Sequence, residues 1–327
     1  MTGPAMIEIL AATPLSSVQD LGRSGVRRYG IGVSGAMDPM ALSAANLLLG
    51  NERGAAGIEI TASPLRLRFL ADTAFSLCGA DGAATLDGLP LPPFWAMAAR
   101  AGQELSVRAP RAGMRAYLAV AGGIDVPVVM GSRSTDLKTG FGGHEGRGLA
   151  AGDRLPIGTP AAPPRIPEGG FGVAPPAGMP LSEADTTEVR VIRAAQYGRF
   201  PEAAHETFWS TAWTLRPDSN RMGFRLAGPA LIPVERVELL SHGILPGVVQ
   251  VPPAGEPMIQ LNDANTCGGY PKMGVVIGAD LWRLGQLRLG GGLRFAEATR
   301  EEALAARAAN EAYLAGVSRA SRLARRV

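Results

Sequence analysis

Residues 103–121, QELSVRAPRAGMRAYLAVA, hold two short runs of strand-forming residues on either side of a turn. The runs cover residues 103–109 and 115–121, and proline and glycine lie between them. Further short runs of this kind occur at residues 6–11, 74–79, 188–194, 231–233, 247–251 and 258–261. Short strands separated by turn residues are typical of barrels and sandwiches, so we predict a mainly β fold with a few helices.

The composition agrees with this prediction. The 327 residues include 43 glycines and 26 prolines, and 19% of them are charged, so turns should be frequent and long amphipathic helices few. One helix is predicted at residues 38–49, where Asp38 is the capping residue, Pro39 takes the first helical position and Gly50 marks the end. A second helix is predicted at residues 296–315, with an interruption at Gly316.

Proline and glycine are densest at residues 156–182, which are typical of a linker or a long wrapping loop. The 46% of apolar residues can supply a core on each side of it. We therefore predict an N-terminal β-barrel lobe at residues 1–160 and a linker at 161–187. A C-terminal β-barrel lobe should follow at 188–296, and a terminal helix with a basic tail at 297–327.

Several classes of function find no support in the sequence. The net charge of +3 and the 6% of aromatic residues predict no nucleic-acid surface. Cys78 and Cys267 are too few for a structural zinc site and fit a reducing compartment. The first residues, MTGPAMIEIL, have neither a signal-peptide pattern nor a membrane-spanning run, so we expect a cytoplasmic location. No nucleic-acid, membrane or metal partner is expected.

The common catalytic motifs are missing as well. The chain has no GxxxxGK[ST] loop for ATP and no GxSxG elbow, and its three histidines show no triad spacing. The GFGGHEG stretch at residues 140–146 matches a dinucleotide-binding loop only weakly. Lys272-Met273 lacks the Ala-Met-Lys-Met context of a biotin attachment site, so covalent biotin is not expected.

Two glycine-bearing polar segments lie in the first half. In residues 18–38, Gln19, Asp20 and Arg23 suit either ligand binding or turn formation, while Arg27 and Arg28 are interpreted as solvated. In residues 131–153, Asp136 is a candidate to orient a cation or act as a base. Lys138, or Arg147 after it, is a candidate to hold a carboxylate or phosphoryl group, with turn formation as the alternative.

Two further segments lie in the second half. In residues 219–228, Asn220 and Arg221 are candidates to bind an anionic or amide-bearing ligand. Residues 239–274 are the densest in polar groups: His242 and Asp263 suit proton transfer, Gln250 suits amide recognition, and Lys272 can stabilise developing negative charge. Thr266 and Tyr270 flank the Gly268–Gly269 pair. His242 suits a structural role equally well, and Cys267 is interpreted as a small buried residue.

These segments together resemble a known family. VQDLGRSG, GAMDPMALSAANLLLGN, GSRSTDLK, SNRMGFRLAG and GGYPK occur here in the order of the allophanate hydrolase subunit 2 and KipA-like family, which is related to biotin-dependent carboxyltransferases. The resemblance extends to about Phe295, and GSRSTDLK and GGYPK are its most specific motifs. Cys267 departs from the pattern, which has a threonine or another small residue there.

The resemblance implies cyclophilin-like β-barrel lobes and ATP-dependent opening of 5-oxo-L-proline to L-glutamate. It also implies two partners, a KipI-like B subunit and a LamB/YcsF-like A subunit, with ATP and Mg bound mainly outside this chain and no activity of the chain alone. The residues named for this chemistry are Asp263, Lys272 and His242 as catalytic groups, and Asp136, Lys138, Asn220, Arg221, Gln250, Thr266 and Tyr270 as substrate contacts.

Two other functions within the family stay open. One is the carboxyltransferase component of a biotin-dependent urea or amide carboxylase. The other is a non-catalytic KipA-like regulator that binds a KipI-like kinase inhibitor. Each of the three functions requires a different partner.

Overall fold

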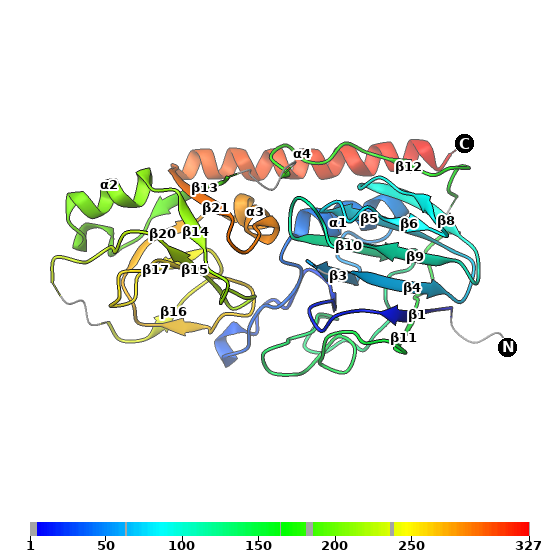
Figure 1. The fold of residues 1–327 in the computed structure, drawn as a ribbon, viewed down its shortest axis with the longest axis horizontal. Coiled ribbons are helices and arrows are strands. Elements are labelled where there is room, and N and C mark those ends of the chain that lie inside the picture. Colours follow the sequence, from blue (N-terminus) through cyan, green and yellow to red (C-terminus); the bar gives the residue numbers. More distant parts are fainter. Residues whose placement is uncertain (1–4, 63, 164, 181–185, 236–238, 327) are drawn as a thin grey trace. The chain divides into compact units, whose positions relative to one another are not determined.

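The computed structural model describes residues 5–62, 64–163, 165–180, 186–235 and 239–326, which form two compact units (Figure 1). Unit 1 comprises residues 1–23, 34–179 and 311–327, and unit 2 comprises residues 24–33 and 180–310. Both units are discontinuous in sequence, whereas the ranges expected from the sequence were continuous. The expectation of a mainly β chain with few helices is confirmed.

Unit 1 contains the helix α1 (Pro39–Leu49), the C-terminal part of the helix α4 (Arg300–Ala324) and two six-stranded sheets. The first sheet has the order β11-β1-β4-β9-β6-β7, and the second the order β12-β8-β5-β10-β3-β2. In chain order the strands are β1 (Met6–Ala11), β2 (Ser17–Gln19), β3 (Gly57–Thr61), β4 (Leu65–Phe69), β5 (Thr73–Gly79), β6 (Thr85–Leu86), β7 (Leu89–Pro90), β8 (Trp95–Ala99), β9 (Glu104–Val107), β10 (Arg115–Val120), β11 (Arg154–Pro156) and β12 (Phe171–Gly172).

The two sheets of unit 1 share one hydrophobic core. In β4, LRLRF, the alternation places Leu67 and Phe69 in this core, while Arg66 and Arg68 point outward and pair with Glu104 on β9. Strands β3, β5 and β10 of the second sheet contribute Ile58, Phe75 and Leu118 to the same core. The period of two along each strand therefore determines which face of each sheet is buried.

The helix α1 begins and ends as predicted. The Asp38 carboxylate accepts from Ala41 N at 2.8 Å, Pro39 is the first helical residue, and Gly50 closes the helix with a positive φ of 75°. The helix packs against β5 and β10 (Figure 1), and Ser76 on β5 donates its hydroxyl to Ala45 O at 2.7 Å.

Unit 2 is built on a closed barrel of seven strands in the order β13-β20-β17-β18-β15-β14-β21. The barrel strands are β13 (Thr187–Arg193), β14 (Trp213–Leu215), β15 (Gly223–Ala227), β17 (Val248–Gln250), β18 (Met258–Gln260), β20 (Lys272–Val276) and β21 (Gly292–Glu297). A separate two-stranded sheet pairs β16 (His242–Gly243) with β19 (Cys267–Gly268). The helices are α2 (Glu202–Ser210), α3 (Leu281–Gln286) and the short 3-10 turns η1 (Arg27–Tyr29), η2 (Tyr197–Arg199) and η3 (Gly278–Asp280).

The predicted terminal helix has different bounds, because α4 covers Arg300–Ala324. Ala296 belongs instead to β21, where it pairs in parallel with Arg190 of β13. The helix starts after Thr299, whose backbone and hydroxyl exchange hydrogen bonds with Glu302 in a capping box. It also continues through Gly316, so the predicted interruption is wrong. The buried Val317 and Ser321 beyond it offset the cost of a helical glycine.

Two other segments differ from the sequence expectations. Residues 231–233 form no strand. Within the expected linker at 161–187, Phe171 and Gly172 form β12 and pair with β8, while residues 164 and 181–185 lie outside the described residues. Among the described helices, none has both the length and the apolar character needed to cross a membrane.

Candidate functional site

The densest predicted segment, residues 239–274, forms one region of unit 2. Strands β16 and β19 bring His242 opposite Gly268, and β17 lies beside β20 in the barrel. Neighbouring atoms come so close to Gly268 and Gly269 that neither position has room for a side chain. A Cβ on Gly268 would lie 2.6 Å from Gln250 Nε2, and one on Gly269 would lie 2.8 Å from Leu239 O.

Gln250 lies at the end of β17 and is 2% exposed. Its Oε1 accepts from Gln260 Nε2 at 3.0 Å, so the amide oxygen is satisfied. Its Nε2 has no hydrogen-bond partner among the described residues. A buried amide group without a partner is costly, which marks this nitrogen as a candidate ligand contact.

Lys272 lies opposite Gln250 on β20 and is 7% exposed. Its Nζ donates to Tyr270 O at 2.8 Å. Burial lowers the pKa of this ammonium group, since the charged form loses its hydration. The predicted amide-binding and charge-stabilising residues are therefore neighbours on paired strands.

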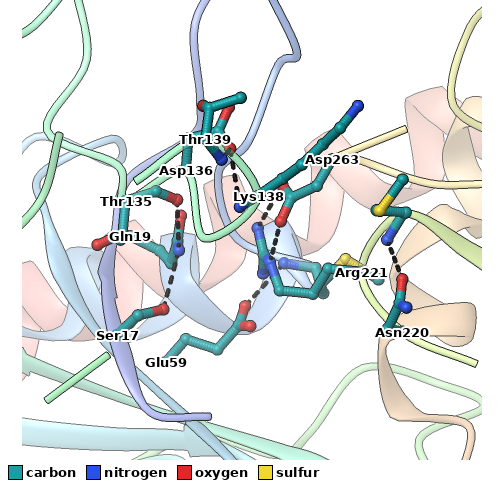
Figure 2. A network of polar contacts seen from close by, with 12 residues as sticks. Ser17, Gln19, Glu59, Thr135, Asp136, Lys138, Thr139, Asn220, Arg221 and Asp263 are labelled. Carbon is teal, nitrogen blue, oxygen red and sulfur yellow. Dashed lines mark hydrogen bonds and ion pairs between the residues drawn. The ribbon is translucent and has the colours of Figure 1, made fainter. Parts of the chain in front are cut away.

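A buried ion pair connects two other predicted residues. Arg221 Nε donates to Asp263 Oδ2 at 2.8 Å, and a second guanidinium nitrogen lies 3.2 Å from Oδ1 (Figure 2). The side chains are 10% and 2% exposed. The bidentate geometry engages both carboxylate oxygens, so this pair fixes the position of the loop that carries Asp263.

Asn220 precedes Arg221 and organises the turn. Its Oδ1 accepts from Met222 N at 2.8 Å, and its backbone pairs with Gly223. The side chain therefore stabilises the turn that leads into β15 and presents Arg221 to Asp263.

Three of the remaining residues of unit 2 lie at the surface. His242 is exposed, with Nδ1 2.9 Å from Leu240 O, and Thr266 is half-buried beside Cys267. Cys267 is itself exposed, so its interpretation as a buried residue is wrong.

Tyr270 lies partly at the surface and partly in a cavity. It is 45% exposed and lines a cavity of about 900 Å³. The other lining residues are Ile232, Pro233, Leu239, Ser241, Val251, Pro252, Pro253, Gly269 and Pro271.

Asp136 and Lys138 belong to unit 1. The buried Asp136 carboxylate accepts from the backbone amides of Lys138 and Thr139, each at 3.0 Å (Figure 2). This is an Asx turn, in which a side chain replaces a backbone acceptor. It presents Lys138 at the exposed tip of the loop.

The same loop is held by two residues of the first polar segment. The Asp20 carboxylate accepts from the hydroxyls of Ser132 and Ser134 at 2.6 and 2.5 Å and from Arg133 N at 2.6 Å. Arg23 is 1% exposed, donates to Ser134 O at 2.5 Å and stacks on the Phe141 ring. Both residues therefore hold the loop in place rather than form a solvated turn.

Two arginines differ from their interpretation in the sequence. Arg27 is not solvated: it donates to Ile244 O, and partial burial lowers its pKa. Arg147, a candidate anion binder, is engaged by Asp153 through two contacts of 2.8 Å and by Glu145. Its guanidinium therefore already has anionic partners within the chain.

Glu59 was not singled out in the sequence. It is fully buried and accepts from Tyr117 Oη at 2.7 Å. Its only signal in the sequence is an acidic residue within the apolar run GIEIT.

The fold and these motifs place the chain in one protein family. The model described as "Carboxyltransferase domain, subdomain A and B" matches residues 29–297, so the chain belongs to that family. The resemblance found in the sequence motifs is thereby confirmed.

Individual relatives are more specific. The chain is 44% identical over 320 residues to the C subunit of 5-oxoprolinase from Escherichia coli, covering 94% of this chain and 96% of the relative. It is 41% identical over 314 residues to the C subunit of 5-oxoprolinase from Haemophilus influenzae, covering 96% and 98%. A putative urea carboxylase of Emericella nidulans is 32% identical over 326 residues, which are 96% of this chain and 26% of that protein.

Solved structures show the same fold within larger proteins. The urea amidolyase of K. lactis superposes with a TM-score of 0.86 at 28% identity, over 97% of this chain and 20% of that one. The urea carboxylase of Kluyveromyces lactis gives a TM-score of 0.85 at 28% identity, over 98% and 30%.

Proposed function

We propose that this chain is the C-type subunit of an ATP-dependent 5-oxoprolinase, which opens 5-oxo-L-proline to L-glutamate together with LamB/YcsF-like A and KipI-like B subunits. The observation that carries the proposal is the match to two proteins named as the C subunit of 5-oxoprolinase, at 44% and 41% identity over nearly the full length of both partners. The urea carboxylase relative is less similar and matches only about a quarter of its length.

The geometry of unit 2 supports chemistry on a cyclic amide. Lys272 and Gln250 offer buried N–H donors side by side. A lactam acid presents two groups with negative charge to such donors, its carboxylate and the lactam oxygen once the carbonyl carbon is attacked. Donors that are fixed in a dry environment stabilise such charge better than water does. Lys272 is therefore proposed as a catalytic group, and Asp263 as the residue that positions Arg221.

The ATP and Mg of the complex are proposed to bind mainly on the partner subunits. Among the described residues, no group of three or more His, Cys, Asp or Glu side chains is placed to hold a metal ion. The sequence also has no GxxxxGK[ST] ATP-binding loop, and an active site to which other subunits contribute would not need one on this chain.

The test is coexpression with the A-type and B-type partners and an assay of ATP-dependent release of L-glutamate from 5-oxo-L-proline. We expect turnover by the assembled complex, none by this chain alone, and a loss of about 100-fold or more for Lys272→Ala in the complex. Arg294→Met, which removes an exposed charge on β21, is the matched control. An assembled complex that releases no glutamate would rule out the proposal.

A second candidate is the carboxyltransferase component of a biotin-dependent urea or amide carboxylase. The family model and the fungal urea carboxylase relatives favour it. It predicts that the chain consumes carboxybiotin when a urea or amide acceptor is added, and this turnover can be measured with free carboxybiotin. Glutamate release without any carboxybiotin turnover would select the first candidate.

A further inference from the structure

We infer that Lys272 and Gln250 form a subsite for the carboxylate group of a small cyclic substrate. The inference deepens the proposed function, on which it rests, because it states which group of the substrate these two residues bind. A lactam acid such as 5-oxoproline carries a carboxylate and an amide, and the two groups require different partners.

The hydrogen-bonding capacity of the two side chains fits a carboxylate. An ammonium group has three N–H donors, and Lys272 uses one of them on Tyr270 O. The Gln250 amide is oriented by Gln260, which donates to its oxygen, so both N–H donors of Nε2 are unused among the described residues. Two donors on each side chain match the two oxygens of a carboxylate, which accept about four hydrogen bonds.

The strand pairing directs these donors to one face. Val249 pairs with Gly274, but Gln250 pairs with Lys272, so Met273 is an extra residue on β20. Without this bulge Gln250 would lie opposite Met273, and Lys272 would point to the other face. Bulges commonly redirect a side chain next to a functional site. Directly opposed residues have Cβ atoms about 5 Å apart, close enough to bind one ligand group.

A cavity lies next to this position, because Val251 and Pro271, the sequence neighbours of Gln250 and Lys272, both line it. The carbonyl that accepts from Lys272 belongs to Tyr270, and Tyr270 lines the cavity of about 900 Å³ together with Gly269 and Pro271. This volume is within the range of small-molecule sites. Gly268 leaves the Gln250 amide room beneath the turn, because any side chain there would displace Nε2.

The energetics of Lys272 also favour an anionic ligand. A buried ammonium loses hydration, and burial is the cause of its lowered pKa. A bound carboxylate would offset this cost. Lysine is also rare in this chain: 30 of its 32 basic residues are arginine, and only Lys138 and Lys272 are lysine. Lysine presents a compact charge with rotatable donors, which suits an oxygen placed between it and the Gln250 amide.

The experiment compares three ligands by isothermal titration calorimetry on the full chain. They are 5-oxo-L-proline, cyclopentanecarboxylate, which has the carboxylate without the lactam, and 2-pyrrolidinone, which has the lactam without the carboxylate. We expect the two carboxylates to bind and 2-pyrrolidinone to bind at least about tenfold more weakly, since a charge-assisted hydrogen bond is lost.

Variants assign the binding to these side chains. Lys272→Met should weaken carboxylate binding by about tenfold or more, and Gln250→Leu by about threefold to tenfold. Arg294→Met removes the same formal charge from the surface of unit 2 and should leave binding unchanged. Carboxylate affinity equal in the wild type and Lys272→Met would overturn the inference, and so would a lack of carboxylate binding by the full chain.

A thermal melt separates this role from a structural one. Lys272 has no ionic partner among the described residues, so its replacement by an apolar chain of similar shape should leave the melting temperature unchanged or raise it. If the Lys272→Met variant has a lower melting temperature than the wild type but still binds carboxylates, the role of Lys272 is structural. Binding of 2-pyrrolidinone but not cyclopentanecarboxylate would assign the pair to the lactam carbonyl instead.

The outcomes also separate this subsite from the proposed function. An assembled complex that opens 5-oxoproline with affinity unchanged by Lys272→Met would keep the function and remove the subsite. Carboxylate binding that depends on Lys272, in a complex without lactam opening, would keep the subsite and remove the function.

Discussion

At the scale of single residues, the charged pairs of this chain differ mainly in burial. Arg221 and Asp263 are both largely buried and joined by two hydrogen bonds. Arg216 and Asp218 lie in the same unit but are 38% and 52% exposed. Water screens the charges of the exposed pair. Each charge of the buried pair has lost its hydration on folding, and the contact with its partner offsets that loss.

This difference predicts unequal costs for one chemical change. Asp263→Asn should lower the free energy of unfolding by about 3 kcal/mol, because the buried Arg221 guanidinium loses the carboxylate that engages it through two nitrogens. Asp218→Asn, the matched control, should cost about 0.5 kcal/mol. Urea unfolding followed by circular dichroism measures both. Equal costs would show that Arg221 gains no more from Asp263 than a surface arginine gains from its neighbour.

At the scale of secondary-structure elements, the end of α1 shows how local and distant signals combine. Gly50 takes the left-handed conformation that terminates the helix. Its missing side chain also leaves room for Arg325, which donates to Leu49 O at 3.1 Å within unit 1. A cation at the C-terminal end of a helix interacts favourably with the last carbonyl groups. Gly50 thus has two roles: its left-handed conformation ends α1, and its lack of a side chain leaves room for the Arg325 guanidinium.

These two roles predict a measurable coupling. Gly50→Ala should cost about 2 kcal/mol or more, from the positive φ and from displacement of the Arg325 guanidinium. Arg325→Met alone should cost about 1 kcal/mol. The double variant should cost less than the sum, since Arg325 is no longer present to be displaced, and thermal or urea unfolding of the four proteins gives the coupling energy. Strict additivity would show that the two residues act independently.

At the scale of the whole molecule, ionisable groups of unit 1 set limits on stability at both ends of the pH range. Arg147 holds the pKa of Asp153 down to about 2. Burial raises the pKa values of Cys78 and Tyr117 well above their usual range. The lowered carboxyl pKa stabilises the fold above about pH 4, and this contribution is lost as pH falls toward 2. The raised pKa values stabilise it below about pH 8.5, and this contribution is lost as pH rises.

The free energy of unfolding should therefore be highest between about pH 4 and 8. Urea unfolding at pH 3, 6.5 and 9.5 measures the loss of unfolding free energy on the acid side and on the alkaline side. Asp153→Asn should reduce the loss on the acid side by about 1 kcal/mol, allowing for screening around the half-exposed Arg147. Cys78→Ala should reduce the alkaline loss by a similar amount. Variants with the same pH dependence as the wild type would exclude these residues as its cause.

The sequence by itself determined those features whose signals are local. The helix α1 was found from Asp38, Pro39 and Gly50, because caps act within one helical turn. Most expected strands were found from short apolar runs, and the family from ordered motifs. The bounds of β21 and α4 were missed, because parallel pairing with β13 brings together segments about a hundred residues apart.

For the candidate site, the sequence indicated the chemistry and only the tertiary structure decided the partners. Residues 239–274 were recognised by their density of polar groups. The pairing of Asp263 with Arg221, and of Lys272 with Gln250, depends on strand register and on one bulge at Met273. Register is decided by burial across a whole barrel, so Lys272 became a candidate carboxylate ligand only when β20 was seen beside β17.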